Sequence, residues 1–208
     1  MNANIIAQEI VRAEQGLGPS LMSVAIFGSG ADDVMNPYYI KAHELALHLS
    51  SAGIAIITGG GGGIMEAANR GAFQGTGASI GLCLKIPNYE KKNEFVRTDH
   101  AFYFSSFFSR KATFLNYAKA YVYFPGGVGT LDELFEVIIA MRAGMIPCLP
   151  LYLIGVEFWE GLIKWLQHSI FDQNLSPKEL VDLIRVTDNI AEVSANLIEH
   201  FRRTGMVN

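Results

Sequence analysis

Short apolar runs rich in β-branched or aromatic residues alternate along the chain with longer segments of helical period. This alternation is typical of a parallel β-sheet that is covered by helices. It predicts a single α/β domain over residues 1–208, a Rossmann-like, doubly wound parallel sheet flanked by helices, with residues 1–20 as an N-terminal helical extension. The strands are expected at residues 23–27, 54–58, 78–84, 121–124 and 149–154.

Helical period and capping residues locate two of the expected helices. Between the first two strands, four apolar residues recur at the spacing of one helical face, and Gly53 follows them as a stop signal. Further along, residues 176–179 combine a capping serine, a proline and a glutamate three positions on, which predicts a helix start among ordinary covering helices. The polar tract at residues 87–99 predicts a loop. The four apolar helix residues are Ala42, Leu45, Ala46 and Leu49.

The composition indicates a protein without a nucleic-acid or membrane partner. Sixteen basic residues stand against 20 acidic ones, so a formal net charge of −4 leaves no broad cationic surface for a long nucleic acid. Cys83 and Cys148 lie far apart in apolar stretches, which favours reduced, buried thiols. The longest apolar run, residues 145–156, is interrupted by Pro147 and Pro150, and the first residues lack a continuous apolar core. We therefore expect a cytoplasmic protein.

Glycine-rich segments follow three of the expected strands: Gly28–Gly30, Gly59–Gly63 and Gly126–Gly129. Because the carboxyl ends of parallel strands meet at one edge of a sheet, these segments should converge. Glycine lets backbone N–H groups approach an anion, and a helix that starts behind it adds further free N–H groups. A tight turn is the simpler explanation of Gly28 and Gly30 alone. Five consecutive glycines cost more backbone entropy than a turn requires, which favours phosphate binding at Gly59–Gly63.

Several familiar sites are disfavoured by spacing. The dinucleotide fingerprint GxGxxG fails because Asp33 occupies its sixth position, and the P-loop fails because Ile64 follows the glycines in place of lysine. His43 and His48 are five residues apart, which turns them roughly 140° away from each other on a helix. We expect neither a metal nor a cofactor, so the chemistry should rest on isolated charged residues near the glycine segments. The candidates are Glu66, Arg110, Lys111, Asp132 and Glu133.

The sequence PGGVGTLDE at Pro125–Glu133 fits the motif PGGxGTxxE of the Lonely Guy (LOG) phosphoribohydrolase family at every specified position. Arg110-Lys111 matches the Arg-Lys pair of that family, and Thr58–Ala72 resembles its first glycine-rich segment. The resemblance spans roughly residues 24–156. It implies hydrolysis of the base–ribose bond of a nucleoside 5′-monophosphate, such as AMP or a modified adenine nucleotide, with Arg110 and Glu133 as the catalytic residues.

The resemblance and the glycine segments together give the expected ligand contacts. N-glycoside cleavage develops an oxocarbenium-like ribose, which the Glu133 carboxylate would stabilise while it orients water. Arg110 would bind the phosphate or the sugar hydroxyls, with Lys111 nearby as a point charge. The expected substrate- and phosphate-binding residues are Gly28, Ser29, Gly59, Gly60, Gly61, Gly63, Met65, Glu66, Lys111, Pro125, Gly126, Gly127, Val128, Gly129 and Thr130.

The sequence departs from plant-type members of the family in two places. Those members carry GGGxxGxM, whereas here one residue separates Gly61 from Gly63, and Phe108-Ser109 replace the usual Met-His-Glu before Arg-Lys. Members are often labelled lysine decarboxylases, but no lysine setting here is typical of a pyridoxal phosphate site. A non-catalytic carrier of a phosphorylated ligand, related to molybdenum cofactor carriers, and a dinucleotide-dependent oxidoreductase are the alternatives.

The segment after Thr130 carries two further expectations. It is apolar around nearly its whole circumference, which predicts a helix buried on two sides and hence a homodimer, as the resemblance also implies. Thr130 followed by Glu133 also has the spacing of a capping box, which predicts a helix that begins near Thr130. The apolar residues are Leu131, Leu134, Phe135, Val137, Ile138, Ile139 and Met141.

Overall fold

The protein folds around one parallel β-sheet. The computed structural model describes residues 3–31, 33–86, 91–177 and 183–205. Their seven strands are ordered β4-β3-β2-β1-β5-β6-β7, and each neighbouring pair is parallel. The expected single α/β domain with a doubly wound parallel sheet is confirmed. The strands are β1 (Ser23–Phe27), β2 (Ala55–Thr58), β3 (Ser79–Leu84), β4 (Ala101–Phe104), β5 (Tyr121–Tyr123), β6 (Leu151–Ile154) and β7 (Ile184–Thr187).

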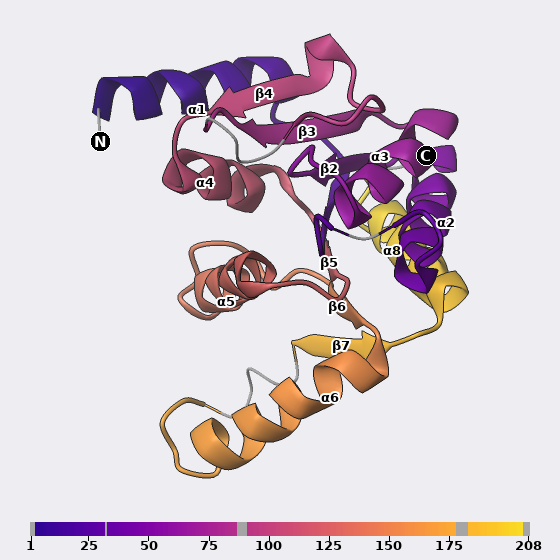
Figure 1. The fold of residues 1–208 in the computed structure, drawn as a ribbon. Coiled ribbons are helices and arrows are strands. Elements are labelled where there is room, and N and C mark those ends of the chain that lie inside the picture. Colours follow the sequence, from indigo (N-terminus) through magenta and orange to yellow (C-terminus); the bar gives the residue numbers. More distant parts are fainter. Residues whose placement is uncertain (1–2, 32, 87–90, 178–182, 206–208) are drawn as a thin grey trace.

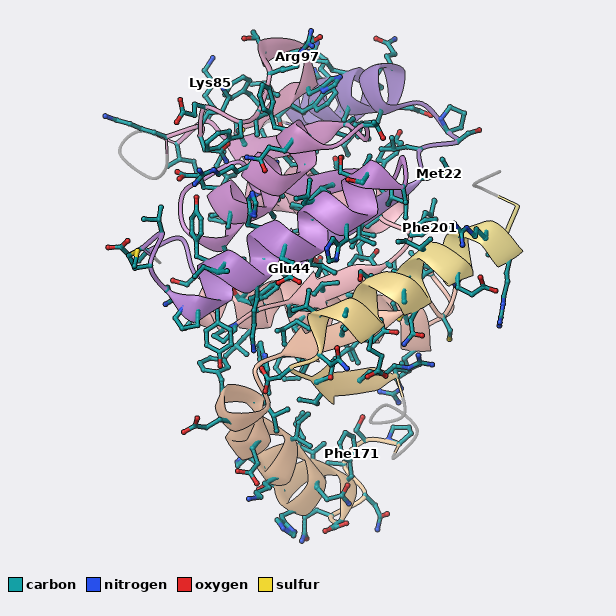
Figure 2. All side chains as sticks on the ribbon, turned by 90° about the vertical axis from the view of Figure 1, so that its right-hand side faces the viewer. Met22, Glu44, Lys85, Arg97, Phe171 and Phe201 are labelled. Carbon is teal, nitrogen blue, oxygen red and sulfur yellow. The ribbon has the colours of Figure 1, made fainter. Side chains whose placement is uncertain are left out.

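Helices cover both faces of the sheet (Figure 1). On one face lie α2, α3 and α8, and Figure 2 shows α2 and α8 side by side there. On the other face lie α4, α5 and α6, with α1 next to α4 at the β4 edge. The helices are α1 (Ala3–Leu17), α2 (Pro37–Ser51), α3 (Ile64–Gln74), the 3₁₀ turn η1 (Thr98–His100), α4 (Phe107–Tyr117), α5 (Val128–Arg142), α6 (Val156–Trp165), the π-helical turn η2 (Leu166–Phe171) and α8 (Ile190–Arg203).

The alternation of side chains along the strands divides the core into two apolar layers. In β1, Val24 and Ile26 pack toward α2 and α8, whereas Ala25 and Phe27 pack toward α4 and α5. Every residue of β1 is buried, because a central parallel strand is covered on both faces. This explains why the sequence shows a continuous apolar run rather than alternating polarity.

Two strands were missed by the sequence prediction, and one predicted helix start cannot be compared. β4 lies at one edge of the sheet, and its apolar sequence AFYF is only four residues long and includes the exposed Tyr103. β7 lies at the other edge, and the exposed Arg185 interrupts its apolar residues. The C-terminal part is therefore not made only of covering helices. The helix start predicted at residues 176–179 cannot be compared beyond residue 177, because residues 178–182 lie outside the described residues.

The direction of winding reverses between the two central strands. The chain proceeds from β1 outward to β4 at one edge and then returns to β5, which pairs with β1 on its other side. At such a switch point the loops that leave the two strands diverge, and a crevice opens at their carboxyl ends. The loops after β1 and β5 are the glycine segments that begin at Gly28 and Gly126.

Candidate active site

The three glycine segments converge at Ser29. Its backbone N–H donates to the carbonyl oxygen of Pro125 at 2.9 Å, and its own carbonyl accepts from the N–H of Ile64 at 2.9 Å. These two hydrogen bonds join the loop after β1 to the loop after β5 and to the start of α3. The three glycine segments therefore converge at one edge of the sheet, as expected.

A cavity of about 450 Å³ opens at this edge. Its volume lies in the range of small-molecule sites. The lining comes from the loop after β1, from the start of α5 and from α3 and α4. The residues are Gly28, Ser29, Gly30, Ala31, Met65, Phe107, Arg110, Gly127, Gly129, Thr130, Asp132 and Glu133.

Arg110 forms the buried cationic part of the cavity wall. It is 5% exposed, and its Nη2 lies 3.9 Å from Oε1 of Glu133, too far for a strong hydrogen bond. Its Nε has no hydrogen-bond partner among the residues that the structure describes. The guanidinium carbon stands 5.7 Å from the ring centre of Phe114. A buried guanidinium with an unused Nε donor is suited to an anionic or hydroxyl-rich ligand.

The glycine run after β2 makes room for Arg110 rather than lining the cavity. A Cβ at residue 59 would overlap Nη2 of Arg110 and stand 2.7 Å from Sδ of Met65. Gly60 has a φ of 77° and Gly63 a φ of 61°, a region that favours glycine. The carbonyl oxygens of Gly60 and Gly61 accept from the backbone and the side chain of Asn93 at 2.8 Å each. Thus Gly59 lies behind Arg110, and none of Gly59, Gly60, Gly61 and Gly63 is among the residues that line the cavity.

Helix α5 begins earlier than predicted, which corrects the capping-box interpretation. Its first residue is Val128 and its N-cap is Gly127, and no side chain of the described residues caps it. Thr130 therefore lies within the first turn, where Leu131 N–H donates to the Gly127 carbonyl at 3.2 Å. Glu133 falls in the second turn, beyond the position of the glutamate in a capping box. Extended backbone at Gly127 starts the helix before the threonine can act as a cap.

The start of α5 leaves backbone open toward the cavity. A Cβ at Gly127 or Gly129 would meet no described atom within 4 Å, so both residues face free space. Gly126 instead packs against the side chain of Thr130. Val128 is 82% exposed and is not among the residues that line the cavity. Free N–H groups at a helix start without a side-chain cap form an anion-binding arrangement.

Glu133 is held by β5. The buried Tyr123 hydroxyl donates to the Glu133 carbonyl oxygen at 3.2 Å. Burial raises the pKa of Tyr123 well above its ordinary value, and the nearby Glu133 charge raises it further, so the phenol stays a donor. The Glu133 carboxyl is 17% exposed and lines the cavity opposite Arg110.

Two expected contact residues are engaged elsewhere. Lys111 Nζ pairs with Asp132 at 3.1 Å and with Glu136 at 3.4 Å. Lys111 itself is not among the residues that line the cavity. Burial lowers its pKa, but these two carboxylates outweigh that effect and hold the pKa above its ordinary value. Glu66 accepts a hydrogen bond from the Tyr39 hydroxyl at 3.1 Å, on the α2 side of α3.

Four lining residues were not in the predicted contact set. Phe107 begins α4 and is 43% exposed at the cavity wall, where an aromatic face suits stacking on a sugar or a base. The others are Gly30, Ala31 and Asp132. The signal for Phe107 was its position three residues before Arg110, which places both on one helical face.

The remaining sequence expectations concern histidines, cysteines and helices. His43 contacts Gln74 at 2.9 Å and His48 contacts Ser194 at 3.4 Å, so the two rings face different neighbours, as their spacing predicts. Cys83 is buried, but Cys148 is exposed, which corrects the expectation of two buried thiols: its apolar neighbours belong to a loop between α5 and β6. Every described helix is too short or too polar to cross a membrane.

Comparison with known proteins places the chain in a family. A family model described as possible lysine decarboxylase matches residues 65–197, well over half of the chain. A cytokinin riboside 5′-monophosphate phosphoribohydrolase of Arabidopsis thaliana is 31% identical over 153 residues, which cover 72% of this chain and 70% of that protein. A probable cytokinin riboside 5′-monophosphate phosphoribohydrolase of Oryza sativa is 27% identical over 158 residues, 74% of this chain and 63% of its own length.

Solved structures agree with this fold. The molybdenum cofactor binding protein of Rippkaea orientalis superposes with a TM-score of 0.62 at 19% identity, over 88% of this chain and 97% of that protein. At this identity the likeness concerns the fold alone. The family model and the Arabidopsis relative carry the assignment: the chain belongs to the Lonely Guy (LOG) family, whose model is described as possible lysine decarboxylase.

Proposed function

We propose that the protein hydrolyses the N-glycosidic bond of a nucleoside 5′-monophosphate, which yields the free base and ribose 5-phosphate. The observation that carries the proposal is the buried Arg110 guanidinium in the wall of the cavity, 3.9 Å from Glu133 and with an Nε that no described residue contacts by a hydrogen bond. A cation and a carboxylate placed together suit a ligand that has an anionic end and develops positive charge at its reacting carbon. The activity for which the two relatives are named is consistent with this chemistry.

The phosphate of the ligand would bind at the start of α5. Gly127 and Gly129 leave the backbone open there, and the positive end of the helix dipole favours an anion. Arg110 would add donors to the phosphate or to the sugar hydroxyls. The fit is electrostatic and needs no side chain from the glycine segments.

The reaction itself would take place beside Glu133. Water adds to the anomeric carbon while the bond to the base breaks and the base leaves with a proton. The positive charge that develops on the ribose lies next to the Glu133 carboxylate, which stabilises it or orients the water. Phe107 would stack on the sugar or the base at the cavity wall.

Release of free base is the direct test of this function. The purified protein is incubated with a panel of nucleoside monophosphates, and the products are separated by chromatography. Free base together with ribose 5-phosphate supports the proposal. If no nucleotide releases base although AMP binds, the chain is instead a non-catalytic binder of a phosphorylated ligand.

The 5′-phosphate is expected to be required. Because the open backbone at Gly127 and Gly129 is arranged for an anion, adenosine should be turned over roughly 10²-fold or more slowly than AMP in kcat/KM. Steady-state rates of adenine release from the two compounds measure this ratio, with ribose 5-phosphate as a competing inhibitor in the control. Equal rates would contradict phosphate binding at the start of α5.

The chain is expected to form a homodimer through α5. Ile139 is 50% exposed and Val128 is 82% exposed on the side of α5 that the sheet does not cover. Ile139→Glu places a charge in this face and should give monomers, because a buried charge without a partner is costly. Light scattering at micromolar concentration measures the mass, and Leu175→Glu, at an exposed apolar residue outside α5, is the matched control. A monomeric mass for the wild-type protein would contradict the predicted homodimer.

A further inference from the structure

The N-terminal helix α1 reaches the helix that carries Arg110. This helix lies outside residues 65–197, the stretch that the family model matches, yet it packs beside β4 and α4 (Figure 1). One of its side chains, Glu9, is only 9% exposed. A carboxylate is rarely buried to this degree unless it is paired or hydrogen-bonded.

Both carboxylate oxygens of Glu9 hold the start of α4. Oε1 accepts from the backbone N–H of Ser105 at 2.7 Å, and Oε2 accepts from the hydroxyl of Ser109 at 2.6 Å. Burial raises the pKa of Glu9, but these hydrogen bonds outweigh it and hold the pKa below its ordinary value. The side chain is therefore an anion at neutral pH, next to the positive end of the α4 dipole.

The two serines bracket the first turn of α4. Ser106 caps the helix by accepting from Phe108 N–H at 3.1 Å, and Arg110 N–H donates to the Ser106 carbonyl at 3.3 Å. Ser109 directly precedes Arg110. Glu9 thus ties together the residues before and within the turn from which the Arg110 side chain leaves.

The guanidinium has little freedom to compensate for a shift of this turn. Its side chain is 6% exposed and is confined between Gly59 and Phe114. A displacement of about 1 Å at a catalytic group lowers rates by roughly 10²-fold in enzymes. A fixed start of α4 therefore fixes the position of the Arg110 guanidinium, which would contact the ligand.

We propose that Glu9 is a positioning residue for Arg110, which makes α1 a structural part of the site although it does not touch the ligand. The inference rests on the proposed role of Arg110 in ligand binding. Glu9→Ala removes both hydrogen bonds, and Ser109→Ala removes one of them and serves if Glu9→Ala fails to fold. Glu14→Ala is the matched control, because Glu14 is an exposed carboxylate on the same helix.

The first measurement is a double-mutant cycle on AMP binding and kcat/KM. We expect Glu9→Ala to lower kcat/KM by about 10-fold to 100-fold, with Ser109→Ala in the same direction and Glu14→Ala unchanged. In an Arg110→Ala background, Glu9→Ala should cost nothing further in AMP affinity. A loss of AMP affinity of the same size in both backgrounds would show that Glu9 acts on general stability and would overturn the proposal.

The second measurement needs no substrate, so it separates this inference from the proposed function. Phenylglyoxal modifies accessible arginines, and peptide mass spectrometry reports its rate at Arg110, with the exposed Arg142 as internal reference. Arg110 should react several-fold faster in Glu9→Ala than in wild type while Arg142 does not change. An unchanged Arg110 rate in folded Glu9→Ala overturns the positioning role, whatever the outcome of the base-release assay.

Discussion

Glu133→Gln is expected to lower the turnover of a nucleoside monophosphate by roughly 10² to 10⁴ while the nucleotide still binds. Glutamine has the same shape, so the substitution removes only the charge that would face the ribosyl cation or the attacking water. The fold should tolerate it, because α5 begins at Val128, so Glu133 lies in the second turn and not at the capping position. What β5 holds is the Glu133 backbone carbonyl, through the Tyr123 hydroxyl at 3.2 Å.

Three measurements on one preparation test this prediction: thermal melting, AMP titration and adenine release. Glu136→Gln is the matched control, since Glu136 lies on the same helix and contacts Lys111 at 3.4 Å. Both variants should melt cooperatively and bind AMP, and only Glu133→Gln should lose turnover. Wild-type turnover in Glu133→Gln would remove the carboxylate from the mechanism and leave Arg110 alone to explain the site.

The central part of the fold could be predicted because its strands are buried on both faces. β1 and β2 appear in the sequence as continuous apolar runs followed by glycines, and the helix between them shows a regular apolar period. β4 and β7 could not be predicted in this way. Each has four residues at a sheet edge and includes an exposed side chain, so only its ladder to β3 or to β6 defines it as a strand.

The sequence was enough to predict where the candidate site lies, but not which residues line the cavity and which support those residues from behind. Arg110 and Glu133 were predicted from motifs, and both line the cavity. The entropic cost of the glycine run after β2 led to the prediction of phosphate binding there. A sequence does not show that Gly59 faces the Arg110 guanidinium of α4. Glu9 gave no signal at all, since its partners Ser105 and Ser109 lie about a hundred positions along the chain.

Gly59→Ala is expected to abolish most of the activity, although residue 59 does not line the cavity. The new Cβ would overlap Nη2 of Arg110 and approach Sδ of Met65 to 2.7 Å. The backbone at residue 59 does not have a positive φ, so alanine meets no conformational barrier and the effect arises from the displaced guanidinium. We expect kcat/KM for AMP to fall by roughly 10² to 10³, the usual cost of losing one donor to the transition state.

A second substitution and a control distinguish this displacement from general damage. Adding Gly59→Ala to Arg110→Ala should lower kcat/KM little further, because the group that alanine displaces is already gone. Gly161→Ala, in the interior of α6, adds a Cβ that meets no described atom within 4 Å. It should leave activity unchanged and stabilise the fold by about 0.5–1 kcal/mol, because alanine is the better helix former. If Gly59→Ala keeps wild-type kcat/KM, then the position of the Arg110 guanidinium against residue 59 is not the one in which it acts.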